Sequence, residues 1–254
     1  MKGLFPVLYR DYVMRTTSPL WLFFDLVVPV MYLLMFGVGF NSALGLGIEL
    51  EGRSLSYNEF FLAGVISMAC FGLAMNQSYG FFVDRDSGIF YETLTYPITR
   101  GEFLLGKIIF QCILAVIQTA LSLAAAAWIL GVNIPSSSLV YLGVGILIVT
   151  SGWFFTFASL AFLMRRTDTF NTVINVVYFV LMFVSSMFYP IDRLPSAFRV
   201  LSYANPVTWH TDVFRWALTG VGSTESALVQ AAAFFIFSLI AFRVALWALS
   251  RAVE

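Results

Sequence analysis

The sequence predicts an all-α integral membrane protein with six transmembrane helices. Its 254 residues are 60% hydrophobic, the mean hydropathy is +0.87, and only 11% of the residues are charged. Soluble domains carry about a quarter charged residues, so this composition excludes a soluble globular protein. The 14 basic residues equal the 14 acidic residues. This balance gives no reason to expect a nucleic acid partner.

Six stretches are long and apolar enough to cross a hydrocarbon core about 30 Å thick, which takes about 20 helical residues. Two of them come from one uncharged tract, Ile108–Met164, which is interrupted by Gly131, Asn133 and Pro135. The predicted spans are residues 20–40, 60–83, 108–130, 139–163, 169–189 and 226–250. No internal repeat or low-complexity linker divides the chain, so residues 1–254 are expected to form one membrane domain.

The basic residues between the spans predict the orientation, because cytoplasmic connections carry an excess of Lys and Arg. Six spans place both termini on the same side as the connections after spans two and four. That side carries ten of the 14 basic residues, and the other side carries Arg53, Arg193, Arg199 and Arg215. We therefore expect a multi-pass protein of the plasma membrane, the inner membrane in a bacterium, with both termini in the cytoplasm.

Residues 2–16 are expected to form an amphipathic helix along the inner face of the membrane. On a helical wheel Phe5, Leu8, Tyr9 and Tyr12 share one face, which suits the membrane interface. Charged residues interrupt the segment and no small-residue cleavage site follows it. A cleavable signal peptide is therefore not expected.

The cytoplasmic connection after the second span combines charges at its start with an apolar middle. This pattern predicts a short helix from about Ser87 to Tyr96, ended by Pro97, within residues 84–97. Such a helix would offer a partner a charged edge together with apolar side chains. The alternative, on composition alone, is a solvated connector.

In this connection the order of residues resembles the loop after the second span in permeases of type 2 ATP-binding-cassette exporters. The residues that carry the resemblance are Arg85, Gly88, Glu92, Leu94, Pro97, Arg100, Gly106 and Lys107. The resemblance implies a coupling helix that docks on a separate ATPase subunit. The residues expected in that contact are Arg85, Asp86, Gly88, Phe90, Glu92 and Leu94.

The outer connection, residues 190–225, is too rich in Trp, Phe and Leu to be disordered. Trp209, Val213, Trp216 and Ala217 recur at helical spacing and predict a short helix in the outer interface. Short extracellular re-entrant helices are expected within residues 191–222. This segment also resembles the same family, which implies an extracellular gate; the alternative is a lid that only packs on the bundle. The expected gate residues are Pro190, Asn205, Pro206, Trp209 and Arg215.

No pattern predicts a metal or a cofactor bound by this chain. Residues 101–107 fit the G-x-x-x-x-G-K spacing of a phosphate-binding loop, but Ile108 stands where the magnesium-binding hydroxyl is needed. His210 is the only histidine, so with Asp212 alone it does not complete a metal site. ATP and magnesium are expected in the partner ATPase, as the resemblance implies.

Two charges lie at membrane depth, Asp25 in the first span and Arg243 in the sixth. Their similar depth allows an ion pair, which would relieve the cost of an isolated charge. The alternatives are snorkelling, pairing of Asp25 with Arg10 or Arg15, and a direct role in transport. Amides at this depth hold helices together or face a pathway. The candidates are Asn76, Gln77, Gln111, Gln118, Asn171 and Asn175.

The sequence offers no carboxylate chain across the bilayer and no ion-filter repeat, which argues against ion coupling. The 27 Phe, 11 Tyr and 6 Trp favour amphipathic cargo. With the resemblance, these features predict the permease subunit of an exporter, a lipid-embedded homodimer that catalyses no reaction itself and moves a drug, lipid or glycolipid by alternating access. The alternatives are a polysaccharide exporter of that family, a channel or carrier not coupled to ATP, and a membrane-embedded enzyme.

Overall fold

The computed structural model describes residues 3–44, 47–50 and 52–253. Within these residues the fold is almost entirely helical, as the sequence predicts. Five helices are long and apolar enough to cross a membrane. They are α2 (Pro19–Leu44), α3 (Tyr57–Asp86), α5 (Arg100–Trp128), α6 (Ser138–Leu163) and α10 (Thr224–Val253).

Two of these helices start where local capping residues place them. Ser56 and Glu59 form a capping box at the start of α3, and Thr99 and Glu102 form another at the start of α5. In each box the two side chains satisfy backbone N–H groups that the helix leaves free. The predicted third span, residues 108–130, is therefore wrong at its start, because α5 begins eight residues earlier and continues into the charged segment.

The helix in the predicted fifth span, residues 169–189, ends before that span does. The helix here is α7 (Thr167–Phe183), and its 17 residues reach about 26 Å. Carbonyl groups on both sides of Phe183 accept hydrogen bonds from a side chain of the outer segment. Asn205 donates to the carbonyls of Leu181 and Val184, at 2.6 and 3.2 Å.

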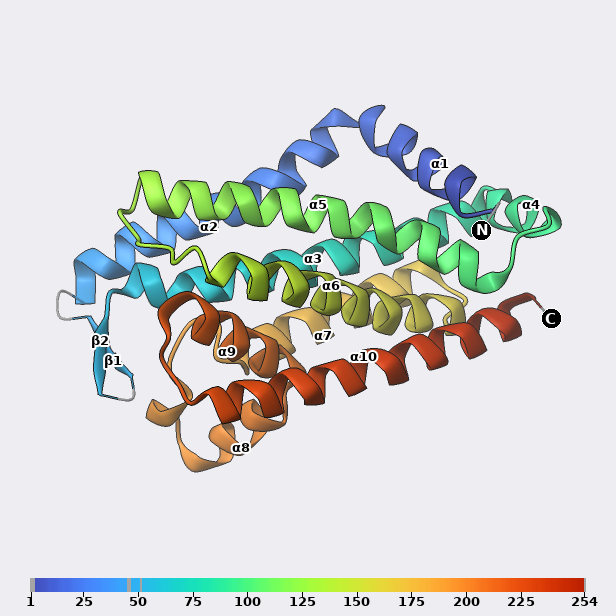
Figure 1. Ribbon diagram of the computed structural model, residues 1–254. Coiled ribbons are helices and arrows are strands. Elements are labelled where there is room, and N and C mark those ends of the chain that lie inside the picture. The colour runs from blue at the N-terminus through green and yellow to red at the C-terminus, as the bar shows by residue number, and fades with distance from the viewer. Residues whose placement is uncertain (1–2, 45–46, 51, 254) are drawn as a thin grey trace.

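The small elements gather at the two ends of the bundle (Figure 1). Both chain ends, α1 (Leu4–Thr16) and α4 (Ile89–Thr95) lie at one end. The opposite end carries the antiparallel hairpin of β1 (Ile48–Leu50) and β2 (Arg53–Leu55), with η1 (Ile191–Arg193), α8 (Ser196–Ala204) and α9 (Pro206–Thr219). The hairpin was not predicted, whereas α8 and α9 fall within residues 191–222, where short helices were expected.

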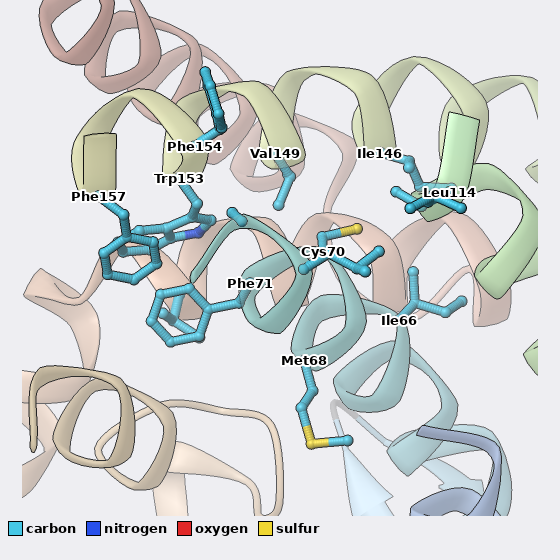
Figure 2. Close-up of a cluster of buried hydrophobic side chains, with 14 of the residues drawn as sticks. Ile66, Met68, Cys70, Phe71, Leu114, Ile146, Val149, Trp153, Phe154 and Phe157 are labelled. Atoms are coloured by element: carbon cyan, nitrogen blue, oxygen red, sulfur yellow. The ribbon is translucent and has the colours of Figure 1, made fainter. Parts of the chain in front are cut away.

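The core is a stack of aromatic rings between α3 and α6. Figure 2 shows Phe71 of α3 facing Trp153 and Phe157 of α6. The ring centroid of Phe71 lies 4.4 Å from that of Trp153 and 5.4 Å from that of Phe157. Each such pair adds about 0.5–1.5 kcal/mol beyond its buried area, so these two helices form the rigid centre of the bundle.

Candidate functional site

At the end that carries both chain ends, α1 lies against the first turns of α5. Val7 is buried there, and a Cβ at Gly106 would lie 2.8 Å from the Val7 Cβ, so this close approach requires glycine. Phe5, Tyr9 and Tyr12 are exposed on the other side of α1. Phe5 and Tyr9 of the predicted interface face therefore point away from the bundle, whereas Leu8 packs against the core and the Tyr12 ring centroid lies 6.4 Å from that of Phe110 of α5. Gly106 of the phosphate-loop-like spacing receives α1.

A buried ion network joins α1, α3 and α5. The Lys107 ammonium group donates to Asp11 and to Asp84 at 3.1 Å each, and all three side chains are at most 4% exposed. Arg10 donates to both carboxylate oxygens of Asp84, and Gln77 donates to Asp11 at 2.9 Å. Each carboxylate is thus paired with a cation, which offsets the cost of its removal from water.

A second ion pair joins α1 to the first membrane helix. The Arg15 guanidinium donates to Asp25 at 2.8 Å, and Asn76 of α3 donates to the other carboxylate oxygen at 3.0 Å. Of the alternatives open for Asp25, the structure therefore shows the pair with Arg15. Arg243 is exposed on α10 and has no ion pair within the described part of the chain.

Two adjoining cavities lie within the bundle. The larger is bordered by α1, α3, α5 and α7, and the smaller by α2, α3, α5 and α7. The first has a volume of about 530 Å³ and the second about 310 Å³, and they share Met75, Asn76 and Asn175. These volumes are those of small-molecule sites. Charged residues of α1, α3 and α5 line the first cavity with Gln77 and Asn171, whereas Asp25, Gln118 and aromatic rings line the second.

Of the amides predicted for a pathway, only Gln111 lines neither cavity. It is fully buried, and both polar atoms of its side chain lack a partner among the described residues. Asp11, Asp84 and Lys107, which the sequence analysis gave no role in a cavity, line the larger one. The sequence feature that could have identified them is the position of each charge at the edge of an apolar stretch.

Phe90 is the one buried side chain among those described for the short helix α4. Phe90 is 3% exposed, and its ring centroid lies 5.9 Å from that of Phe103 and 6.0 Å from that of Phe162. Ile89, Tyr91 and Glu92 are exposed. Phe90, expected in the partner contact, therefore anchors α4, and the outer surface of the helix includes Tyr91, which the sequence analysis did not name.

The helix predicted from about Ser87 to Tyr96, within residues 84–97, is shorter in the structure. α3 continues to Asp86, and α4 runs only from Ile89 to Thr95. Gly88 separates them with a φ of +77°, a left-handed conformation that favours glycine and breaks the helix. The side chains of Asp86 and Leu94, both expected in the contact, lie outside the described residues.

Arg85 lies at the end of α3 and contacts the end of α6. Its guanidinium donates to the carbonyls of Met164 and Arg165 at 3.0 and 3.2 Å, and it lies 4.4 Å from the ring centroid of Phe82. A cation at a helix C-terminus satisfies carbonyl groups that have no partner inside the helix. The structure therefore gives Arg85 a contact within the bundle.

At the opposite end, Asn205 joins two helices. Its amide nitrogen donates to the last turn of α7, while its Oδ1 accepts from the Val207 amide at the start of α9, at 2.9 Å. Pro206 follows as the first residue of α9, where a missing N–H group costs nothing. Trp209 donates to the Tyr203 carbonyl at 2.7 Å, which ties α9 to α8.

Arg215 of α9 is buried beneath the segment that follows α7. It donates to the Ser186 carbonyl and to Asp212 at 2.5 Å each, and its guanidinium carbon lies 4.0 Å from the ring centroid of Phe60. Asp212 also accepts from the Ser186 hydroxyl at 2.6 Å. Of the predicted gate residues, Arg215 and Pro190 line an outer cavity of about 210 Å³, whereas Asn205, Pro206 and Trp209 are not part of its lining.

His210 is fixed as a neutral side chain. Trp153 donates its indole N–H to the His210 Nε2 atom at 3.0 Å, so the proton of the ring lies on Nδ1 and faces the Ser67 hydroxyl at 3.1 Å. Burial lowers the pKa of His210 to about 3. Among the described residues no group of three or more His, Cys, Asp or Glu side chains is placed to hold a metal.

Long apolar helices around polar cavities, with small helices at both ends, define a polytopic membrane permease. The family described as ABC-2 type transporter matches residues 4–219, and the chain belongs to this family. It is 24% identical over 218 residues to the putative transport permease ycf38 of Cyanophora paradoxa, covering 85% of this chain and 74% of the relative. It is 23% identical over 231 residues to the inner membrane transport permease YadH of Escherichia coli K12, covering 88% and 86%.

Proposed function

We propose that this permease is the membrane subunit of an ATP-driven exporter. A separate ATPase binds at the end that carries α1 and α4, and that end lies in the cytoplasm of a bacterial cell. α7, continued by the segment up to Pro190, completes a sixth crossing. The charge bias of the connections supports this orientation, because ten of the 14 basic residues lie at that end.

The observation that carries the proposal is the way α4 is attached. A seven-residue helix has too few turns to be stable alone, and here Phe90 fixes it to α5 and α6. Movement of α4 is therefore transmitted to both membrane helices. Its exposed surface combines Glu92 with Ile89 and Tyr91, a mixture of charge and apolar area that suits a protein partner.

A second copy of the chain supplies the other wall of the pathway. α2 and α7 border the smaller cavity, and they leave large apolar side chains uncovered, among them Met35, Val176, Phe179 and Phe183. In a homodimer these faces meet or line the space between the copies. Closure of the ATPases then switches the access of the cavities from the inner to the outer side.

The cargo that fits the cavities is amphipathic. The larger cavity combines charged side chains with apolar ones such as Met14, Phe170 and Ile174, and the adjoining one combines Asp25 with aromatic and aliphatic side chains. A molecule with a polar head and an apolar body, such as a drug, a lipid or a glycolipid, matches both. The chain itself binds no nucleotide in this proposal, and ATP with magnesium belongs to the ATPase subunit.

The test is recovery of the ATPase with this chain. The tagged chain is solubilised mildly from its native membrane, and the proteins that co-purify are identified by mass spectrometry. We expect a soluble ATPase in equal amount, and at least a tenfold loss of it with Glu92→Arg, because the change reverses the charge of the exposed surface of α4.

The matched control is Glu225→Arg, the same change at an exposed residue at the other end of the bundle. It should retain the ATPase. Recovery of the chain as a stable oligomer without any ATPase would contradict the proposal, and flux through liposomes without ATP would then favour a channel or carrier. If Glu92→Arg recovered as much ATPase as the wild type, this result would exclude α4 as the docking surface.

A further inference from the structure

The amides around Asp25 use their N–H groups inside the protein. Asn76 donates to the Asp25 carboxylate at 3.0 Å, and Gln118 donates to the Asp25 backbone carbonyl. Asn175 donates to the Asn171 carbonyl one turn earlier, at 2.7 Å. The 310 Å³ cavity is lined by Asp25, Asn76, Gln118 and Asn175.

The groups around the cavity that remain able to bind a ligand are therefore hydrogen-bond acceptors. The Gln118 side chain is 1% exposed, and its Oε1 atom has no partner among the described residues. The Asp25 carboxylate accepts two hydrogen bonds, fewer than its two oxygens can accept. A buried acceptor without a partner is destabilising, because it has lost its hydrogen bonds to water. A ligand that donates N–H groups would satisfy these atoms, whereas a ligand with only acceptors would not.

Aromatic rings supply the rest of the wall. Phe24, Tyr32, Tyr178 and Phe179 line the cavity. Tyr178 is held in place by stacking on Phe71, with 4.7 Å between the ring centroids. A positive charge is attracted to the face of an aromatic ring, most strongly where water is excluded. Acceptor oxygens and ring faces together favour a cation.

A cation of the protein itself contacts the Asp25 carboxylate. The Arg15 guanidinium lies 2.8 Å from Asp25, and its second nitrogen lies 3.4 Å from the Gln77 side chain. Arg15 belongs to α1 and lines the larger cavity. A cationic ligand that enters from that cavity can replace the Arg15 contact without leaving Asp25 unpaired.

From these contacts we propose that the cavity beside Asp25 binds the protonated amine of an amphiphilic cargo. The ammonium group donates to Asp25 and Gln118, and the apolar body lies against Val28, Leu73 and Met182. As a statement about cargo this rests on the proposed export function. Binding itself requires neither the ATPase nor transport, so the two can fail separately.

The experiment measures binding to the purified full chain in nanodiscs of zwitterionic lipid at pH 7, with empty nanodiscs as background. The probes are a mono-dansylated alkyl diamine, which carries one ammonium group, and the same compound with that amine acetylated. We expect the wild type to bind the charged probe at least tenfold more tightly than the neutral one. Asp25→Asn should abolish this preference, because it removes the charge and keeps the shape.

Two pairs of variants separate recognition from folding. Asp168→Asn makes the same change at an exposed residue of α7 and should keep the preference. Tyr178→Phe keeps the aromatic ring and should keep the preference for the charged probe. Tyr178→Leu removes the ring and should reduce this preference at least threefold. Equal affinity of the wild type for both probes, or a preference that survives Asp25→Asn, would overturn the proposal. If Asp25→Asn does not fold, a preference that survives Tyr178→Leu would overturn it.

Discussion

Lys107 holds two buried carboxylates together at the joint of three helices. It is 3% exposed and contacts Asp11 of α1 and Asp84 of α3. Without the ammonium group, Asp11 would keep only the Gln77 amide and Asp84 only Arg10. Removal of one partner from a buried ion group typically costs about 3–5 kcal/mol, because a charge remains without compensation.

Lys107→Met should therefore lower the free energy of unfolding by about 3 kcal/mol, measured by thermal unfolding of the chain in nanodiscs. Arg100→Met is the matched control, since Arg100 is exposed at the start of the same helix, and it should change stability by less than about 0.5 kcal/mol. Adding Asp11→Asn to Lys107→Met should recover part of the loss. Unfolding of Lys107→Met at the wild-type temperature would refute this role.

The sequence predicted charges at the edges of the spans but not their partners. Asp11 and Lys107 are 96 positions apart, and Asp84 and Lys107 are 23 apart. Such pairs depend on how whole helices pack, which no local pattern records. For Asp25 the sequence allowed Arg10, Arg15 and Arg243 as partners. The choice of Arg15 follows from the docking of α1 onto α5 at Gly106.

At the scale of elements, α7 and α9 depend on each other through Asn205. One amide side chain satisfies carbonyls at the end of α7 and an N–H group at the start of α9. These are the groups that a helix cannot pair internally. Asn205 thus stabilises both the end of α7 and the start of α9, and loss of the hydrogen bonds to one of these helix ends should destabilise that end.

Asn205→Ala should increase hydrogen exchange both at residues 181–190 and at residues 206–210, measured by mass spectrometry of proteolytic peptides. Asn205→Asp keeps the acceptor and loses the donor, so it should increase exchange mainly at residues 181–190. Asn133→Ala, at an exposed residue of the same end, is the control and should change neither peptide. Unchanged hydrogen exchange at both segments in Asn205→Ala would contradict the proposed role of Asn205 in joining α7 and α9.

The elements that the sequence predicted well are those that local physics decides. The first four predicted spans and the sixth follow from length and hydropathy. The helix α6 begins one residue before the predicted span 139–163 and ends with it. The end of α7 could not be predicted, because Asn205 and Arg215 lie more than 20 positions away from the carbonyls that they bind. The β-hairpin has strands of only three residues, too short for a periodic signal.

At the scale of the molecule, the two ends of the bundle face opposite sides of the membrane. α4 and both chain ends lie at one end, and α8 and α9 at the other (Figure 1). The expected orientation places Ser87 in the cytoplasm and Ser196 outside; both residues are exposed.

A cysteine-free background, with Cys70 and Cys112 replaced by alanine, makes this arrangement measurable. Ser196→Cys should react with a membrane-impermeant maleimide in intact cells. Ser87→Cys should react only in inverted membrane vesicles. Labelling of both variants from the same side would contradict the orientation.

Packing is unequal among the membrane helices. Of the 26 residues of α6, 14 are buried, whereas α7 buries only Phe170, Ile174 and Met182 among its 17. A helix with so few buried contacts loses little when it shifts, so its local opening requires far less free energy than unfolding of the aromatic centre. α7 therefore shifts at a lower cost in free energy than α3 or α6. Substitutions on its surface should alter the speed of the cycle more than the melting temperature of the protein.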